Sequence, residues 1–331
     1  ERLSAAVCVW PIVTSVGCSS GFASVYECPF QGACVSTNSS QCSIGYTSVL
    51  CAVCDTDHYL KPSGCALCGD TTSSLTLGIV CIIIGCILFY VGYRVYRSRH
   101  SRSASSSGKK KTMTAALGIL ITFAQIIGSV DSVYSAPWSS TYLDSLAWFK
   151  LALGDVFQTL GVTCVNPNWN FYSGLLFTTL MPIAILASLA LLYIVRPVWR
   201  TNCVKAMSLL MMLVYPAVSL KSLQTFSCHQ VDGISYLRAD YSIKCDGAEY
   251  TAYASYAGVV VALISIGCPL GLGLYLYSKK KTMDSDKTRE RIGHIYSQYQ
   301  PKYYYWEVVE MLRKLFLTGV VVFFGRGTSV Q

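Results

Sequence analysis

The stretch at residues 303–324 reads YYYWEVVEMLRKLFLTGVVVFF and decides the fold class of the chain. Four aromatic residues lead into an apolar run, a pattern typical of a helix that enters a membrane with its rings at headgroup level. Within the run, Glu310 is followed by Arg313 and Lys314 at spacings that place side chains side by side on a helix. Glu307 lies one turn earlier on the same face. The stretch therefore predicts a membrane helix with one charged face.

Two depths of this charged face are compatible with the sequence. If the span begins at Tyr303, a rise of about 1.5 Å per residue puts Arg313 roughly 15 Å deep, near the middle of a bilayer. A charge there costs at least about 2.5–3.5 kcal/mol unless it is paired or faces water, which would indicate a functional pathway. Alternatively the charges lie at the inner headgroups, with Lys314 extending to the water. In that case residues 315–324 alone are too few to cross, since about 20 are needed.

The rest of the chain also has the composition of a membrane protein. Its 331 residues are 53% hydrophobic, which excludes an ordinary soluble domain. Five further apolar runs reach spanning length, at residues 75–96, 113–134, 171–195, 204–226 and 252–277. With residues 303–324 they predict an all-α polytopic bundle of about six transmembrane helices within residues 71–331.

The placement of the basic residues predicts the orientation. Most of the 26 Lys and Arg residues fall in the loops after the first, third and fifth predicted spans, which lie on one side. The positive-inside rule makes that side cytosolic and the N-terminus extracellular or lumenal. The membrane itself is expected to be a plasma or ciliary membrane. The net charge of +9 is then a topology signal, with some attraction to anionic lipid, and no nucleic-acid partner is expected. Because Glu1 is no start methionine, we expect that a signal peptide preceded it.

Residues 1–70 are expected to form a small extracellular domain held together by disulfides. They contain nine of the sixteen cysteines and too few apolar residues for a core, so that cross-links are needed. Residues 51–68 follow a Cys-x2-Cys-x10-Cys-x2-Cys spacing that also fits a zinc ribbon, but an oxidising outer side favours disulfides. The disulfide candidates are Cys8, Cys18, Cys28, Cys34, Cys42, Cys51, Cys54, Cys65, Cys68, Cys164, Cys228 and Cys245.

The cysteine count predicts two disulfide pairings, and a sequon predicts one modification. Since nine is odd, one N-terminal cysteine needs a partner elsewhere, and Cys164 on the predicted outer side is the economical choice. Cys228 would then pair with Cys245 and close a short loop. Asn38 begins an Asn-Ser-Ser sequon on the same side and is a candidate for glycosylation.

Polar residues in and between the spans complete the predicted membrane unit. Residues 136–169 are too polar to span and are expected to lie at the outer interface as an amphipathic helix. Asp131 and Lys221 stand at similar depths, where they either pair between helices or each reach the headgroups. Gln125 is placed to hydrogen-bond across the bundle. Pro269, within the Gly-rich stretch at residues 267–273, is expected to break the fifth helix locally.

The chemistry of an enzyme is not found in the sequence. The four histidines are scattered without metal-ligand spacing, and neither a Gly-rich phosphate loop nor a nucleophile elbow is present. We therefore expect neither enzymatic activity nor a cofactor.

Two stretches resemble a known group of proteins. They are SYLRADYS at residues 235–242, followed by Cys245-Asp246, and YYWE at residues 304–307, followed by Glu310, Arg313-Lys314-Leu315 and Leu317-Thr318-Gly319. They resemble large multipass membrane proteins of algae, oomycetes and related protists, which carry extracellular cysteine-rich, ephrin-receptor-like (EGF-like) repeats before a multi-span region. Residues 51–68, with His58-Tyr59 between the cysteine pairs, are similar to the end of such a repeat. The resemblance covers about residues 50–331, and its layout is similar to that of TRP-like and polycystin-like channels.

Two classes of function are compatible with these features. The first is a TRP-like ion channel or channel-like sensor subunit, in which Glu307, Glu310, Arg313 and Lys314 gate or brace the bundle and Asp131, Lys221 and Gln125 are their outer counterpart. The second is a membrane anchor or receptor whose cysteine-rich ectodomain binds an extracellular protein, filament or wall. The expected partners are the lipid bilayer, such an extracellular partner and further copies of the chain. A channel should contain a continuous polar path, and an anchor should have a dry bundle.

Overall fold

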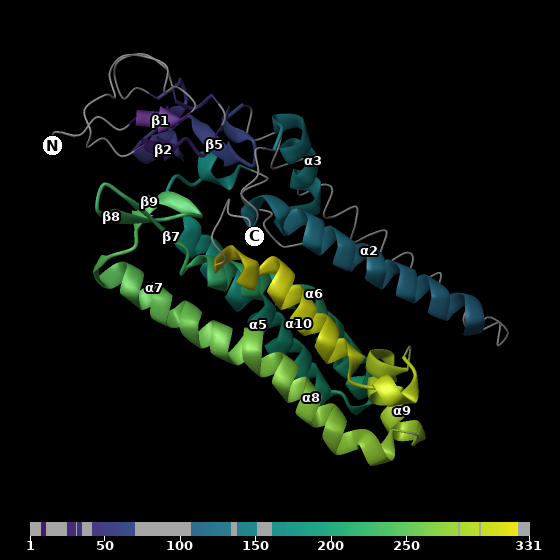
Figure 1. Ribbon diagram of the computed structural model, residues 1–331. Coiled ribbons are helices and arrows are strands. Elements are labelled where there is room, and N and C mark those ends of the chain that lie inside the picture. Colours follow the sequence, from purple (N-terminus) through teal and green to yellow (C-terminus); the bar gives the residue numbers. More distant parts are fainter. Residues whose placement is uncertain are drawn as a thin grey trace.

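The structure is a computed structural model that describes residues 8–10, 25–30, 32–34, 42–69, 107–133, 138–150, 161–283, 285–297 and 299–323. The predicted span at residues 75–96, Cys18 and Asn38 lie outside the described residues, as do the side chains of Cys8 and Asp131. Small strands gather at one end of the molecule, and long helices run side by side away from them (Figure 1). The predicted class is confirmed in its coarse form, since the chain is mostly helical with a disulfide-rich N-terminal region.

The N-terminal region consists of short strand pairs linked by disulfides. Strands β1 (Cys8–Trp10) and β2 (Val25–Glu27) pair in parallel. Strands β3 (Tyr46–Thr47) and β4 (Val53–Cys54) pair in antiparallel fashion around the short helix η1 (Val49–Cys51). Strands β5 (His58–Lys61) and β6 (Gly64–Leu67) form a hairpin. Because pairs of this size are marginal alone, the cross-links described below are needed to hold them.

A second β unit lies between two long helices, where only a loop was expected. Strands β7 (Cys228–Val231), β8 (Ile234–Leu237) and β9 (Asp240–Lys244) form an antiparallel meander. Asp232 and Gly233 connect the first two strands with φ of 50° and 79°, the positive values that a tight two-residue hairpin requires. Leu237 and Ile243 of this sheet are buried in one cluster with residues at the start of α5.

Three helices are long and apolar enough to cross a membrane, counting only the described residues. They cover Phe171–Val195, Pro197–Gln224 and Gly247–Thr282. The first is α5, with the bounds predicted from the sequence. The second contains η4 (Pro197–Trp199) and α6 (Arg200–Gln224), and the third contains α7 (Gly247–Val260), the π-helical segment η5 (Val261–Ile266), α8 (Gly267–Lys279) and η6 (Lys280–Thr282). Both begin several residues before the predicted spans.

Of the other expected spans, residues 113–134 and 303–324 do not form helices of this kind, and residues 75–96 lie outside the described residues, so the count of six stays a prediction. Helix α2 (Ser107–Val133) contains a shorter apolar segment, Gly118–Val130. The predicted outer interfacial segment contributes α3 (Ser140–Lys150) and the short helix η3 (Val162–Cys164). The predicted continuous helix at residues 303–324 is wrong in its bounds, because η7 (Pro301–Tyr303) precedes α10 (Trp306–Thr318), and Gly319 separates α10 from η8 (Val320–Phe323). Glycine weakens a helix interior by about 1 kcal/mol, which favours an end there.

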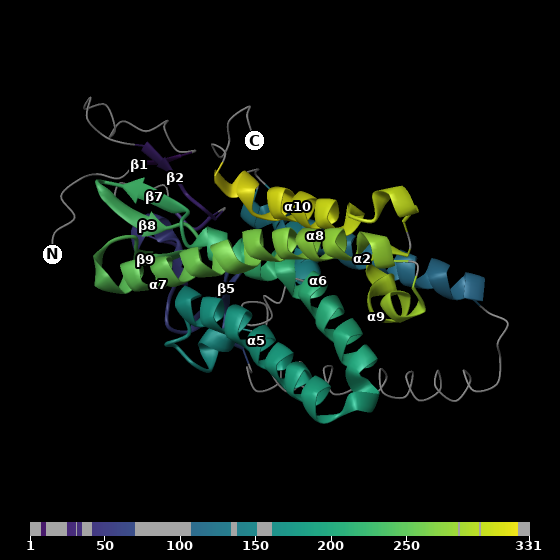
Figure 2. The same cartoon turned by 90° about the horizontal axis from the view of Figure 1, so that it is seen from below.

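Two views of the molecule show how these helices are arranged. Figure 2 shows α5 and α6 meeting at a corner, with α8 and α10 lying side by side above α6. Helix α9 (Asp286–Tyr296) lies at the end of the bundle away from the strands in both views. It is held there by Ile292 and Ile295, which are buried against Leu276 of α8.

Candidate functional site at the junction of the disulfide-rich domain and the helices

A shared hydrophobic cluster joins the N-terminal region to the β7–β9 sheet. Leu50 and Ala52 from the N-terminal region are buried together with Val231 and Tyr236 from the sheet. Their exposed fractions are 9% or less. Because burial of apolar surface is the main favourable term in association, this cluster docks the disulfide-rich region onto the part of the chain between α6 and α7.

A disulfide between Cys68 and Cys164 makes the second connection. It links the end of the N-terminal region to η3, a sequence separation of 96 residues. Near it, the Ser63 hydroxyl donates a hydrogen bond of 2.7 Å to Asp144 of α3. The N-terminal region is therefore attached to the helical part at two places besides the chain itself.

The described disulfides account for most of the candidate cysteines. The bridges are Cys28–Cys34, Cys42–Cys51, Cys54–Cys65, Cys68–Cys164 and Cys228–Cys245. The four cysteines of the zinc-like spacing belong to three different bridges, so they form no metal site here. A disulfide between Cys164 and an N-terminal cysteine was predicted, and the structure shows that this cysteine is Cys68. Cys203 and Cys268 are free thiols among the described residues.

We call the cluster of Leu50, Ala52, Val231 and Tyr236 the docking cluster. His229 lies at its edge. Its Nδ1 atom is 3.0 Å from the Tyr241 hydroxyl, and Tyr241 packs against the docking cluster. Burial, and to a lesser degree the positive charge of Arg238, hold the pKa of His229 below its usual value. The imidazole is therefore kept neutral at neutral pH, and its protonation works against the folded junction.

Polar side chains connect the long helices at a proline. Pro269 has no amide hydrogen, so the carbonyl of Ser265, four residues earlier, loses its helical donor. The Tyr215 hydroxyl of α6 donates to that carbonyl at 2.8 Å, and the Ser265 hydroxyl donates to Ser219 at 2.9 Å. A local break of the fifth helix was predicted at residues 267–273, and this prediction is wrong, because the helix is continuous there. It passes through the π-helical segment η5, and α6 supplies the missing donor.

Two further contacts cross between helices. Gln125 of α2 is fully buried, and its Nε2 atom donates to the Leu213 carbonyl at 2.7 Å, the kind of contact across the bundle that was predicted for it. Thr179 and Tyr256 share a hydrogen bond of 2.5 Å between their hydroxyls, which joins α5 to α7. These buried bonds fix the mutual register of the helices, because each leaves an unpaired polar group if it is lost.

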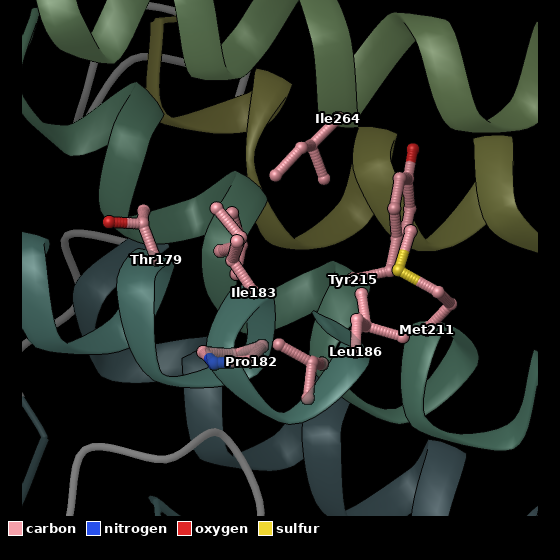
Figure 3. Close-up of a pocket in the computed structure, with 9 residues that line it drawn as sticks. Thr179, Pro182, Ile183, Leu186, Met211, Tyr215 and Ile264 are labelled. Carbon is pink, nitrogen blue, oxygen red and sulfur yellow. The ribbon is translucent and has the colours of Figure 1, made fainter. Parts of the chain in front are cut away.

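A small apolar cavity lies next to these contacts. Its volume is about 20 Å³, room for about one water molecule. Figure 3 shows Pro182, Ile183 and Leu186 facing Ile264 across the space, with Met211 and Tyr215 at its side. A lining with almost no polar surface gives a water no partners, so this space is dry.

The predicted charged face lies on α10. The Arg313 guanidinium binds Glu310 at 2.6 Å, and the Tyr299 hydroxyl donates to Glu307 at 3.1 Å. Lys314 is partly buried on the same helix. The helix runs along α6 and α8 (Figure 2), and about half of the Arg313 side chain is exposed on the surface of α10. Its depth in a membrane stays a prediction.

Lys221 does not lie in open space at the end of α6. Its Nζ atom lies 4.7 Å from the centre of the Phe171 ring, at the start of α5. The other half of the predicted ion pair is Asp131, whose side chain is outside the described residues. The pairing of Lys221 with Asp131 therefore stays a prediction.

Comparison with known proteins gives one partial relative and no family. No family model matches the sequence, and no solved structure matches it. The chain is similar to "Cysteine repeat modular protein A" of Toxoplasma gondii, with 33% identity over 117 residues. The similar part covers 33% of this chain and 4% of the relative, so the chain spans a small fraction of that protein's length. With the membrane-capable helices and the disulfides, this similarity defines a membrane protein with a cysteine-rich domain.

Proposed function

We propose that this chain is a membrane anchor of the receptor type, which holds a cysteine-rich ectodomain at a plasma or ciliary membrane surface for an extracellular protein or filament. The observation that carries the proposal is the double attachment of the ectodomain. The docking cluster around Leu50 and Tyr236 and the Cys68–Cys164 disulfide hold it on the helical part. Such an attachment transmits a pulling force from an outside partner into the membrane helices.

The ectodomain also presents apolar side chains that a partner could cover. Ile44 is 97% exposed and Leu67 is 70% exposed. Leu67 pairs with His58 across the β5–β6 hairpin, and His58 lies against Gly45, the residue after Ile44. These two side chains leave apolar surface on a small disulfide-bonded domain that binding of a partner would remove from water. The name of the Toxoplasma gondii relative refers to cysteine repeats, which agrees with the cysteine-rich composition of this region.

The alternative, a TRP-like ion channel or channel-like sensor, has less support. Among the described residues, Tyr215, Ser219 and Ser265 hydrogen-bond directly to one another between the helices. The cavity beside them is small and dry. A conducting path needs polar groups along its whole length. We also propose that the chain has no enzymatic activity and that the cysteine-rich side faces outward, with α9 on the cytosolic side.

Two measurements on the full chain test the anchor. The first is ion flux through liposomes that contain the purified protein, with empty liposomes as the baseline. The second is antibody labelling of cells that express a short epitope inserted after Ile44, compared with the same epitope inserted after Thr282. We expect no flux above the baseline, labelling of the first epitope on intact cells, and labelling of the second only after permeabilisation.

Each measurement has an outcome that contradicts the proposal. Flux of any of K⁺, Na⁺, Ca²⁺ or Cl⁻ above the baseline would favour the channel. Labelling of the epitope after Thr282 on intact cells would reverse the orientation and place the cysteine-rich region in the cytosol.

A further inference from the structure

Basic side chains gather at the end of the bundle away from the strands. The last turn of α8, the short helix η6, helix α9 and the short helix η7 meet at this end (Figures 1 and 2). Their exposed cations are Lys279, Lys280, Lys281, Arg289, Arg291 and Lys302. Asp286, in the first turn of α9, is an exposed acid among them. Apart from it, the described exposed charges on these four elements are positive.

Two of these lysines are held in place by neighbouring tyrosines. Lys280 Nζ lies 5.6 Å from the centre of the Tyr304 ring, and Lys302 Nζ lies 5.7 Å from the centre of the Tyr303 ring. Cations over aromatic faces are attracted to them, and the contact limits the rotamers of the lysine. Tyr303 and Tyr304 are adjacent in the chain, so these two contacts place lysines that are 22 residues apart in the sequence against neighbouring residues.

One face of α8 leads from the apolar part of the helix to this place. Leu270, Leu274 and Tyr277 are 61%, 71% and 70% exposed. They follow one another at spacings of four and three residues, so they form a single stripe on the helix, and Lys281 continues it one turn later. A stripe that is apolar along a membrane-capable helix and positive at its end matches the two parts of an anionic lipid, the acyl chain and the phosphate.

We propose that this end of the molecule binds an anionic phospholipid. The phosphate headgroup lies between Lys280 and Lys302, and an acyl chain lies along the stripe that ends at Lys281. A lipid is favoured over a free phosphate because the stripe and the lysines form one continuous surface. The site depends on α8 lying in a membrane and not on what the ectodomain binds, so a failure of the anchor proposal leaves it untouched.

The test is a titration of the purified full chain in a nonionic detergent with dioctanoyl phosphatidylinositol 4,5-bisphosphate, followed by native mass spectrometry. The variant is Lys280→Gln with Lys302→Gln. Each lysine near a phosphate contributes about fivefold in affinity, so we expect the double variant to bind about 30-fold more weakly. The charge-preserving double variant Lys280→Arg with Lys302→Arg should stay within about threefold of the wild type.

Lys61, in the disulfide-rich N-terminal region, provides a matched control. Lys61 also lies over a tyrosine, with its Nζ atom 5.4 Å from the centre of the Tyr59 ring, but it belongs to the ectodomain. Lys61→Gln should leave lipid binding unchanged. Soluble inositol trisphosphate, which lacks the acyl chains, should bind at least about tenfold more weakly than the lipid, because it leaves the α8 stripe uncovered.

Three results would overturn the proposal. They are lipid binding by the glutamine double variant within about threefold of the wild type, an equal loss in Lys61→Gln, and inositol trisphosphate binding as tight as that of the lipid. If the glutamine double variant does not fold, the single variants Lys280→Gln and Lys302→Gln decide, each with an expected loss of about fivefold.

Discussion

Removal of the Cys68–Cys164 disulfide tests the attachment of the disulfide-rich N-terminal region to the helices. The substitution of both cysteines by serine opens a loop closed over a sequence separation of 96 residues. The chain-entropy estimate for a closed loop of about 100 residues is about 4.7 kcal/mol. Helix α2 accounts for 27 of these residues, and we leave them out of the loop length because their hydrogen bonds lie within the helix. Because the estimate depends on the logarithm of loop length, this lowers the figure only to about 4 kcal/mol.

A loss of about 4 kcal/mol corresponds to an increase of up to about 1,000-fold in the open population of the junction. Hydrogen exchange measured by mass spectrometry on the protein in nanodiscs reads this population directly. We expect faster exchange in peptides that contain the docking cluster, at residues 46–54 and 228–237. Peptides from the middle of α5 and α6 should exchange at the wild-type rate, because their hydrogen bonds do not depend on the junction.

A second pair of substitutions is the matched control. Cys228→Ser with Cys245→Ser opens a bridge with a sequence separation of 17 residues, for which the same estimate gives about 3 kcal/mol. This change should loosen the β7–β9 sheet while residues 58–67 keep their exchange rates. The reasoning is refuted if loss of the Cys68–Cys164 bridge leaves exchange at the junction unchanged, or if it accelerates exchange equally throughout the helices.

Three further changes probe individual contacts. Tyr215→Phe removes the donor to the Ser265 carbonyl and should destabilise the helical part by about 1–3 kcal/mol, measured as a lower melting temperature in detergent. Gly319→Ala should destabilise it by about 1–3 kcal/mol in the same assay, because an added Cβ would stand 2.6 Å from the side chain of Leu223. The lowered pKa of His229 means that the unfolded chain binds its proton more readily, so junction stability should be full above about pH 6.5 and fall as the pH drops below it. Hydrogen exchange at pH 7.5 and pH 5.5 checks this, and His229→Gln should reduce the difference.

The results that would contradict these three predictions are specific. An unchanged melting temperature for Tyr215→Phe would mean that the Ser265 carbonyl has another donor. Gly271→Ala is the control for Gly319→Ala, because an added Cβ at Gly271 meets nothing within 4 Å and should be neutral or slightly stabilising. Equal losses in the two glycine variants would refute the packing argument. A His229→Gln variant that keeps the full acid sensitivity would assign it to other groups.

The membrane-capable helices were predictable where one local signal dominates. Helix α5 has the predicted bounds because its apolar run is continuous, and its N-terminus is marked by Asn170, whose side chain accepts a hydrogen bond from the Ser173 amide. The helix that was expected to end at Phe324 ends at Thr318. A prediction from hydropathy alone takes no account of Gly319. This glycine lies against Leu223 and allows α10 to approach α6 closely.

The π-helical segment could not be predicted from its own residues. The proline at position 269 indicates a lost helical hydrogen bond, from which a local break of the helix was predicted. The outcome depends on Tyr215, which comes from another helix 50 residues earlier and supplies a donor. A signal was present, since a tyrosine in an apolar span needs a partner for its hydroxyl, but the partner is defined only by the packing.

The junction was only partly predictable. The odd number of N-terminal cysteines indicated a bridge to Cys164, but not that Cys68 forms it. The β7–β9 sheet was missed, although Asp232-Gly233 between Val231 and Ile234 is a strong hairpin signal. Its role in holding the ectodomain depends on contacts with residues 49–52, far away in the chain, which no local pattern reveals.

The central claim is that the cysteine-rich region faces an oxidising space and is tied to the helical part through its last cysteine. Proteolytic peptide mapping of the purified protein under non-reducing conditions, after alkylation of free thiols, tests it most directly. We predict a peptide pair linked through Cys68 and Cys164, with Cys203, which is buried in the folded protein, alkylated as a free thiol once the protein is unfolded without a reductant. Alkylation of Cys68 and Cys164 in the native protein, or zinc bound at residues 51–68, would contradict it.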